Sequence, residues 1–376
     1  MKEIQNSILE ELGFKKIVNA AGHYTMLGGS RPYPVANHAM ELASRYWIDM
    51  NDLQRNAGNV LKSLLGCEDG MITTGAYSAL VIATNVAMLG VRPGLKHKVI
   101  VQSSHVTRYS EAFRAAGVDL LEIERESKSE SIKDHADDST VALAYVVSEA
   151  KSEEFSLEET VEAGNELGIP VIVDASLVDP PITGIKNILN HAPSLVAVSG
   201  GKGFNGPNNS GILIGKADLV ESARKISFPN YGVGRGMKIS KEQIAGLVAT
   251  IKFASTVNEE ELIQSWKDTL EKIRKQIVEM PGVSTRIDFP WKLNIPQPVP
   301  RLYIIVDEAS GGKTKAEEIR NNLRYFDPPI MTRPPSDARA PENSIVIEGR
   351  CIEPEDIETL VKGINSSLVA RLKETT

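Results

Sequence analysis

Between residues 58 and 215 the chain alternates short apolar segments with helix-like segments, and this alternation most constrains its fold. Strands that alternate with helices of roughly 10–15 residues predict βαβ units and a mainly parallel sheet. A continuous apolar strand such as 171–173 is typical of a sheet covered by helices on both faces. We therefore expect an α/β fold. The expected strands are 71–74, 98–101, 120–123, 141–147, 171–173 and 195–198, with 211–214 as an antiparallel return.

The remainder of the chain predicts a second, smaller α/β domain. A helix-like stretch over 240–280 with few breakers would lead the chain out of the large domain. We expect an N-terminal arm and entry segment over 1–45, a large domain over 46–245, and a linking helix with a small C-terminal domain over 246–376. Ser156 and Glu159 predict a capping box. Further helices are expected at 76–89, 110–116, 157–167, 314–325 and 354–374, and further strands at 302–306 and 344–347.

Composition excludes several classes of function. Lys and Arg number 42 against 49 Asp and Glu, a net charge of −7, which argues against nucleic acid as a partner. The two cysteines, Cys67 and Cys351, are too few for a disulfide framework, and no His or Cys spacing predicts a metal site. No signal-peptide core and no run of about 18 apolar residues is present, so we expect a cytoplasmic protein without a membrane span.

The most informative segment follows the expected strand 195–198 and is rich in glycine. Small residues at Gly200, Gly201 and Gly203 surround Lys202 and would let the backbone approach a bulky ligand. A partly desolvated lysine in such a loop can lose its proton and attack an aldehyde carbon. The alternative is a solvated loop lysine with glycines that serve turns.

Asp174 ends the apolar strand 171–173, where open α/β sheets bind ligands. Pyridoxal phosphate (PLP) needs such a carboxylate, because it keeps the pyridine nitrogen protonated and the ring an electron sink. Ser176, two residues further on, could touch the ring edge or its phenolic oxygen. The alternatives are a helix cap for Asp174 and a turn hydroxyl for Ser176.

A phosphate turn is expected at Thr74, Gly75 and Ala76, between a strand and a helix. Backbone N–H groups at a helix start, together with the helix dipole, bind phosphate. No GxxxxGK or GxGxxG pattern is present, which disfavours nucleoside triphosphates and nicotinamide cofactors. Ser199 could add a hydroxyl to the phosphate, and the His105 imidazole could stack on the cofactor ring; a surface or capping histidine is the alternative.

Together these segments resemble the fold-type-I PLP-dependent enzymes, in particular the selenocysteine synthase (seryl-tRNA selenium transferase)-like family. Within it the chain is most similar to the D-glucosaminate-6-phosphate ammonia-lyase branch. The resemblance spans nearly the whole chain. It rests on the segments 17–22, 66–69, 73–78, 172–175, 199–202, 206–211, 232–238 and 241–242 and on Arg333 and Arg350.

The resemblance implies a role for each matching residue. Lys202 would hold PLP as a Schiff base, Asp174 would pair with the pyridine nitrogen, and the turn at Gly75 would hold the phosphate. Arg333 or Arg350 would bind the substrate carboxylate; both could instead form structural ion pairs. The family builds its sites at a homodimer interface. Candidate anchors for a substrate phosphate are Arg235, Lys238, His23 and Arg31, and candidates to serve the partner's site are Tyr46, Arg55 and Lys238.

The expected reaction is α,β-elimination on a small hydroxylated amino acid or amino-sugar acid, with ammonia released. Two departures disfavour tRNA as substrate: the motif at Asn19 begins near the first residue, leaving no room for a tRNA-binding domain, and the phosphate turn is not asparagine-rich. The alternatives are selenium transfer on seryl-tRNA, an aminotransferase, and a non-catalytic relative that keeps the fold.

Overall fold

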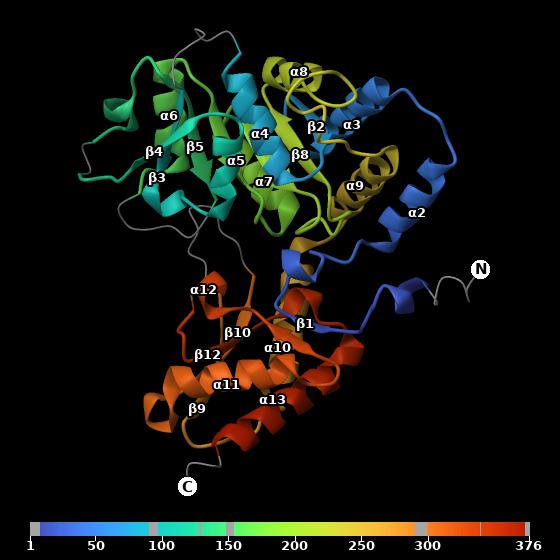
Figure 1. The fold of residues 1–376 in the computed structure, drawn as a ribbon, viewed down its shortest axis with the longest axis vertical. Helices are drawn as coiled ribbons and strands as arrows, with labels where there is room; N and C mark the ends of the chain where they lie inside the picture. The colour runs from blue at the N-terminus through green and yellow to red at the C-terminus, as the bar shows by residue number, and fades with distance from the viewer. Residues whose placement is uncertain are drawn as a thin grey trace. The chain divides into compact units, whose positions relative to one another are not determined.

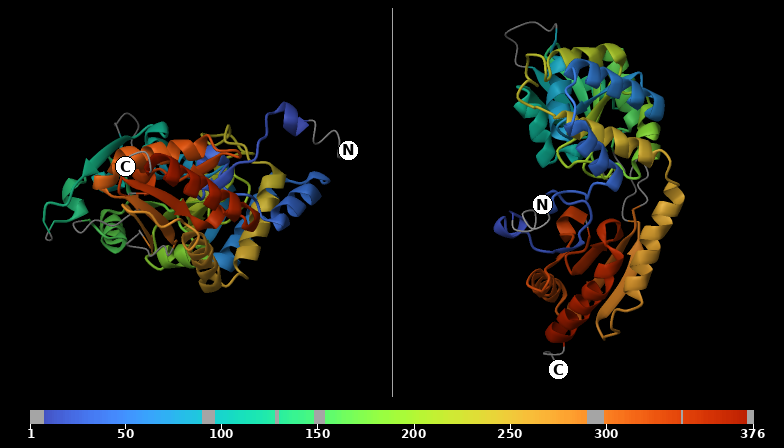
Figure 2. Two further views of the ribbon diagram at one scale, coloured as in Figure 1. Left: turned by 90° about the horizontal axis from the view of Figure 1, so that it is seen from below. Right: turned by 90° about the vertical axis from the view of Figure 1, so that its right-hand side faces the viewer.

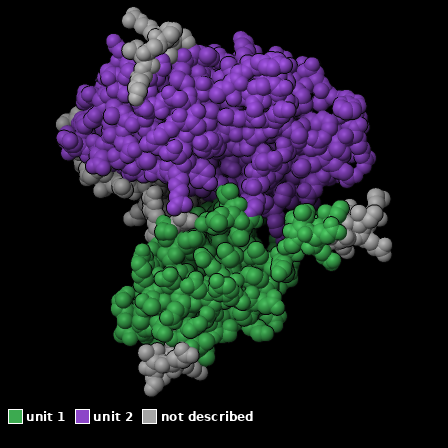
Figure 3. Space-filling view, viewed as in Figure 1, with its two compact units in different colours: residues 1–27, 258–290, 298–376 green, residues 28–257, 291–297 purple. Residues whose placement is uncertain are grey.

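The computed structural model describes residues 8–89, 97–127, 130–147, 154–289, 299–338 and 340–372. These residues form two compact units, coloured separately in Figure 3. The large unit lies within 28–257, and the small unit combines the N-terminal residues up to 27 with 258–289 and the C-terminal residues from 299. Within the described residues, no helix is both long and apolar enough to cross a membrane.

The large unit is built on a seven-stranded sheet with the order β2-β8-β7-β6-β5-β3-β4 (Figure 1). Neighbouring strands from β7 to β4 are parallel, whereas β8 runs antiparallel to both β7 and β2. This confirms the predicted mainly parallel sheet and the antiparallel return. The strands are β2 (Asp69–Thr73), β3 (Lys98–Gln102), β4 (Asp119–Ile123), β5 (Thr140–Val146), β6 (Val171–Asp174), β7 (Leu195–Ser199) and β8 (Gly211–Gly215).

Helices cover both faces of this sheet because its strands carry apolar side chains on both sides. In β6, Val171 and Val173 join one buried cluster while Ile172 joins the other. The first cluster includes side chains of α3 (Met50–Leu65), α6 (Leu157–Leu167), α7 (Pro181–Leu189) and α9 (Lys241–Ala254). The second includes α4 (Ala76–Ala87), α5 (Glu111–Ala115) and α8 (Ala217–Lys225), and α2 (Pro34–Ser44) packs on α9.

The small unit contains an antiparallel sheet of order β12-β10-β9 and a parallel pair, β1 with β11. Figure 2 shows α10, in gold, and α13, in red, running along this unit. Their apolar side chains share one core with β10 and β12. The elements are β1 (Val18–Ala20), α10 (Glu259–Arg274), β9 (Val283–Asp288), β10 (Arg301–Val306), α11 (Gly312–Arg324), β11 (Ile330–Thr332), α12 (Pro335–Ala338), β12 (Ser344–Glu348) and α13 (Ile357–Leu372).

Two boundaries differ from the prediction. The predicted arm 1–45 is divided, because β1 pairs with β11 in the small unit while α2 packs on α9 in the large one. The second boundary falls at residue 257 rather than 245. The predicted long helical stretch over 240–280 is helical but interrupted. The first helix, α9, ends at Ala254, and Asn258 caps a new helix by accepting hydrogen bonds from the N–H groups of Glu260 and Glu261.

Candidate active site

The predicted cofactor residues follow strands that end at the same edge of the large sheet. β2, β3, β5, β6 and β7 all run in one direction, since β8 is antiparallel to its two neighbours. Open α/β sheets bind ligands beyond the carboxyl ends of their strands. The edge therefore gathers Thr74, Gly75 and Ala76 after β2, His105 after β3, Asp174 and Ser176 at the end of β6, and Ser199, Gly201 and Lys202 at and after β7.

Lys202 is half-buried in a loop that is tied down at several points. The Asn205 N–H donates to the Lys202 carbonyl (2.9 Å), and the Ser30 N–H donates to the Gly201 carbonyl (3.0 Å). The Lys202 Nζ lies 5.2 Å from the centre of the Tyr109 ring. Two buried polar atoms of this region, Ser30 Oγ and Asn205 Oδ1, have no hydrogen-bond partner among the described residues.

The glycines of this loop are required by the protein's own packing. A Cβ at Gly201 would lie 2.5 Å from the Asn208 Cα, and one at Gly200 would lie 2.3 Å from the Ser210 Oγ. The sequence suggested that these glycines let a ligand approach. In the structure the backbone of Asn208 and the side chain of Ser210 occupy that space, so the glycines shape the loop that presents Lys202.

Replacing Gly201 by alanine should therefore destabilise the loop. The new methyl group meets backbone atoms, which have little room to move, and overpacking of this kind costs about 1–3 kcal/mol. We expect a lower midpoint of urea unfolding and weaker retention of PLP on dialysis. Gly236→Ala is the matched control, because a Cβ there would meet nothing within 4 Å. An unchanged midpoint for Gly201→Ala would contradict the packing argument.

Asp174 is 5% exposed and its carboxylate is held in place locally. The Ser176 N–H donates to Asp174 Oδ1 (2.9 Å). Ser176 is buried as well, so its backbone fixes the direction of the carboxylate. A buried, oriented carboxylate at a strand end can interact with a cationic ring nitrogen.

The predicted phosphate turn lies at the start of α4. Gly75 is the residue that precedes the helix, with φ +131°, and no side chain caps the first turn. A Cβ at Gly75 would meet nothing within 4 Å, so space is open beside this backbone. The Thr74 and Ser78 hydroxyls lie 2.6 Å apart. An uncapped helix start with open space beside it suits a phosphate group.

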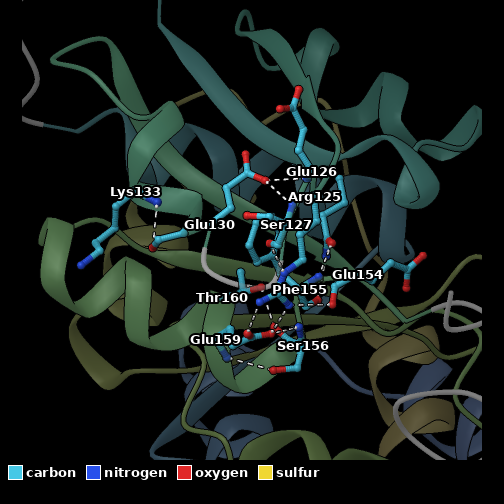
Figure 4. Close-up of polar contacts among 12 residues, drawn as sticks. Arg125, Glu126, Ser127, Glu130, Lys133, Glu154, Phe155, Ser156, Glu159 and Thr160 are labelled. Atoms are coloured by element: carbon cyan, nitrogen blue, oxygen red, sulfur yellow. Dashed lines mark hydrogen bonds and ion pairs between the residues drawn. The ribbon is translucent and has the colours of Figure 1, made fainter. Parts of the chain in front are cut away.

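His105 is almost fully buried, and both of its ring nitrogens face protein groups. The Val146 N–H donates to Nδ1 (3.4 Å), and Nε2 lies 3.6 Å from the Glu154 carboxylate. The segment after Glu154 is fixed in turn, because Gln102 exchanges two hydrogen bonds with the Phe155 backbone. Figure 4 shows Arg125 donating to the Glu154 carbonyl (3.3 Å). The imidazole is thus held in one orientation.

In the small unit, Arg333 and Arg350 surround a buried carboxylate, that of Glu348. Glu348 is 0% exposed at the end of β12. Burial alone would raise the pKa of its carboxyl, but the positive charges around it, first that of Arg350, outweigh burial and hold the pKa at about 2. The charge of His23, which is also buried, adds to this effect. The two arginines thus form structural ion pairs; their contact with a substrate stays a prediction.

Two further predicted anchors, Arg235 and Lys238, lie after α8 in the large unit. The Arg235 guanidinium lies over the rings of Phe228 (5.1 Å) and Tyr231 (5.3 Å). Its Nη1 is buried and has no hydrogen-bond partner in the part of the chain that the structure describes. Lys238 is exposed.

A separate pocket of about 440 Å³ is lined by none of the predicted cofactor residues. Its lining includes Asp49, Asp52, Arg55, Glu221, Arg224 and Asn230.

Sequence reasoning missed Tyr109, Glu154, Arg301 and Glu348. Glu348 ends the apolar run 345–347 as Asp174 ends 171–173, so the same pattern could have found it. Arg301 is the partner of Glu348 across the β10–β12 ladder.

Among the described residues, no three His, Cys, Asp or Glu side chains are grouped as metal ligands.

This architecture, with Lys202 and Asp174 at the carboxyl edge of a mainly parallel sheet, is that of the fold-type-I PLP-dependent enzymes. A solved structure of D-glucosaminate-6-phosphate ammonia-lyase matches 97% of this chain and 98% of its own, with a TM-score of 0.78 and 21% identity. Serine palmitoyltransferase from Sphingomonas wittichii matches with a TM-score of 0.60 and 12% identity over 94% of this chain and 87% of its own.

Sequence comparison confirms the resemblance to the selenocysteine synthase-like family. A 5'-C-glycyluridine monooxygenase-decarboxylase from a Streptomyces species is 27% identical, covering 96% of this chain and 92% of its own. D-glucosaminate-6-phosphate ammonia lyase from Salmonella typhimurium is 26% identical over 65% and 69%. An L-seryl-tRNA(Sec) selenium transferase from Aquifex aeolicus is 22% identical over 98% and 88%. No protein-family model matches the chain.

Proposed function

We propose that this protein is a PLP-dependent lyase that releases ammonia from a 2-amino-3-hydroxy acid, such as an amino-sugar acid. The observation that carries the proposal is the grouping of Lys202, Asp174 and the open turn at Gly75 on one sheet edge. The similarity to D-glucosaminate-6-phosphate ammonia lyase supports this reaction over others.

The residues at this edge fit the cofactor. Lys202 would hold PLP through its amine, the buried Asp174 would face the ring nitrogen, and His105 would lie against the ring. The start of α4 at Gly75 and Ala76 would hold the phosphate, and the hydroxyls of Thr74 and Ser199 would add to it. Bound PLP supplies an electron sink for the pair of electrons left when the α-proton is removed.

The chain's own groups then move the protons. Lys202 Nζ would take the proton from the α-carbon and deliver one to the 3-hydroxyl, which leaves as water. Water replaces the amino group afterwards, so one 2-amino-3-hydroxy acid becomes one 2-oxo acid and one ammonia. For the substrate carboxylate we propose Arg333 and Arg350. For a substrate phosphate we propose Arg235 and Lys238, with His23 as a further candidate.

The names of the relatives support this class of substrate. D-glucosaminate and a seryl group both carry an amine on carbon 2 and oxygen on carbon 3, and the glycyluridine joins a glycyl unit to a nucleoside. A small amino acid unit with a hydroxylated extension is the shared feature.

The test is a panel assay for ammonia and 2-oxo acid with PLP-loaded protein. We expect equal amounts of both products from at least one of D- and L-serine, threonine, D-glucosaminate and its 6-phosphate. Alanine, which lacks the 3-hydroxyl, is the matched control and should release none. If Arg235 and Lys238 hold a phosphate, the 6-phosphate should show the lower KM. No release from any member of the panel would refute the lyase.

The same set of substrates also distinguishes the lyase from two other reactions. The glycyluridine relative favours a second candidate, oxidative decarboxylation, which consumes dioxygen and releases carbon dioxide. Uptake of dioxygen with carbon dioxide release would identify it. An aminotransferase would instead leave a stable pyridoxamine form.

The selenium transferase alternative requires tRNA, and the net charge of −7 disfavours it. A measurement of tRNA binding at low salt tests this alternative.

We also propose a cytoplasmic homodimer with shared active sites. Tyr46, Trp47 and Ile48 form a run of large side chains before α3 that are 68%, 100% and 48% exposed. Exposed aromatic residues of this kind are enriched at protein interfaces. Sedimentation of the purified chain measures the oligomeric state, and a monomer would refute this part.

A further inference from the structure

The aromatic ring of Tyr109 lies against the amine of Lys202 within the large unit. The centre of the ring is 5.2 Å from Lys202 Nζ. This is inside the distance of about 6 Å at which the face of an aromatic ring attracts a cation. Tyr109 follows β3 and Lys202 follows β7, so the carboxyl ends of two strands supply the pair. Lys202 also has a further interaction, to which the ring contact adds.

Hydrogen bonds fix the backbone of the segment that carries Tyr109. The Tyr109 N–H donates to the Thr107 hydroxyl (3.1 Å), and the Thr107 N–H donates to the Ser110 hydroxyl (2.9 Å). This capping box leads directly into α5, whose Ala112 and Phe113 are buried. The Tyr109 ring itself is 42% exposed. The backbone therefore sets where the ring lies, and a change of the ring should leave the fold intact.

The contact between ring and amine has most effect when the amine is charged. In the proposed reaction Lys202 Nζ takes the α-proton and becomes an ammonium group. Lys202 is half-buried, so the ammonium group has lost part of its hydration, and this is unfavourable unless other groups replace the water. The negative face of an aromatic ring is such a group. It attracts the ammonium without taking its proton, which Lys202 must pass on to the 3-hydroxyl.

We propose that Tyr109 is a positioning residue that holds the Lys202 ammonium group against the face of its ring. The inference rests on the proposed function in one respect, that Lys202 Nζ carries the transferred proton. A different role, proton donation by the phenol hydroxyl, would need the oxygen and not the ring. Two substitutions distinguish these roles: Tyr109→Phe keeps the ring and loses the hydroxyl, and Tyr109→Leu loses both.

The contact can be measured without turnover on the full chain freed of PLP. Reductive methylation with ¹³C-labelled formaldehyde adds methyl groups to lysine amines and keeps their positive charge. The Lys202 resonance is the one that Lys202→Ala lacks. Methyl groups over the face of an aromatic ring are shielded by it. We expect an upfield Lys202 resonance in the wild type and in Tyr109→Phe. In Tyr109→Leu it should take the position of an exposed lysine such as Lys186.

The effect of the contact on the reaction is measured with the PLP-loaded protein. Tyr109→Leu should lower kcat for ammonia release by about fivefold or more, the effect of losing a partly desolvated cation–π contact. Its KM should stay within about twofold, because the ring acts on Lys202 and not on the substrate. Tyr109→Phe should keep kcat within about twofold of the wild type. Tyr109→Met is a second variant without a ring, for the case in which the leucine variant does not fold.

Tyr325→Leu is the matched control, because Tyr325 is 90% exposed and has no proposed role. It should change neither the Lys202 resonance nor kcat. An unshifted Lys202 resonance in the wild type, an equal shift in Tyr109→Leu, or an unchanged kcat in that variant overturns the inference. A kcat in Tyr109→Phe as low as in Tyr109→Leu also overturns it, since the hydroxyl then acts. The lyase proposal fails separately: if the wild type releases no ammonia from any substrate, the lyase is refuted, and the resonances alone decide whether Tyr109 holds the amine.

Discussion

Lys202→Ala should lower ammonia release by at least about 10³-fold, within the range that a general base contributes. The variant loses the amine that would hold PLP and also the group that would move the α-proton. No other lysine shares its loop, whose glycines are packed against Asn208 and Ser210. The loss should therefore appear in kcat and not only in the amount of cofactor bound.

The measurement combines kinetics with covalent labelling. Borohydride reduction of the yellow wild-type protein should fix the cofactor to a peptide that contains Lys202. The variant should give no labelled peptide even with excess PLP. Lys186→Ala is the matched control, because this lysine of α7 is exposed and has no proposed role. A label on another lysine, or full activity in Lys202→Ala, would show that the cofactor assignment is wrong.

The parts of the fold that local sequence determines could be predicted. The capping box of Ser156 and Glu159 is formed, and α6 has the predicted bounds. Apolar runs between turn residues located the central strands, because a strand buried on both faces carries few polar residues. The break between α9 and α10 was missed since it contains neither proline nor glycine. The acidic run 259–261 after Asn258 is a helix-start signal that could have located it.

In the candidate site, too, some groupings of residues could be predicted from the sequence and others could not. Lys202, Asp174 and Gly75 follow strand ends, and parallel strands bring such positions to one edge whatever the details of packing. The cluster around Glu348 depends instead on register. Arg301 meets Glu348 because β10 and β12 pair antiparallel with those two residues opposite each other. Nothing in the local sequence specifies that register. The close approach of the Gly22 backbone to Glu348 depends on a further pairing, that of β1 with β11.

Asp174→Asn should lower kcat by roughly 10²-fold or more, comparable to the loss of one electrostatic stabiliser in an active site. The amide has the shape of the carboxylate, and its oxygen can still accept the Ser176 N–H that now binds Oδ1. The fold and the position of the side chain should thus be kept while the negative charge is lost. Without that charge the ring nitrogen is less protonated, and the ring withdraws electrons less strongly.

The expected pattern for Asp174→Asn is a large fall in kcat with a small change in KM and in the midpoint of thermal unfolding. The absorbance of bound PLP should change as well, because the protonation of the ring alters its spectrum. Asp69→Asn serves as the control, since Asp69 is a carboxylate on the same sheet, pairs with Arg224 and has no proposed role in the reaction. Unchanged kcat in Asp174→Asn would remove the carboxylate from the proposed chemistry. A fall in stability equal to that of the control, with activity lost in proportion, would assign Asp174 to the fold alone.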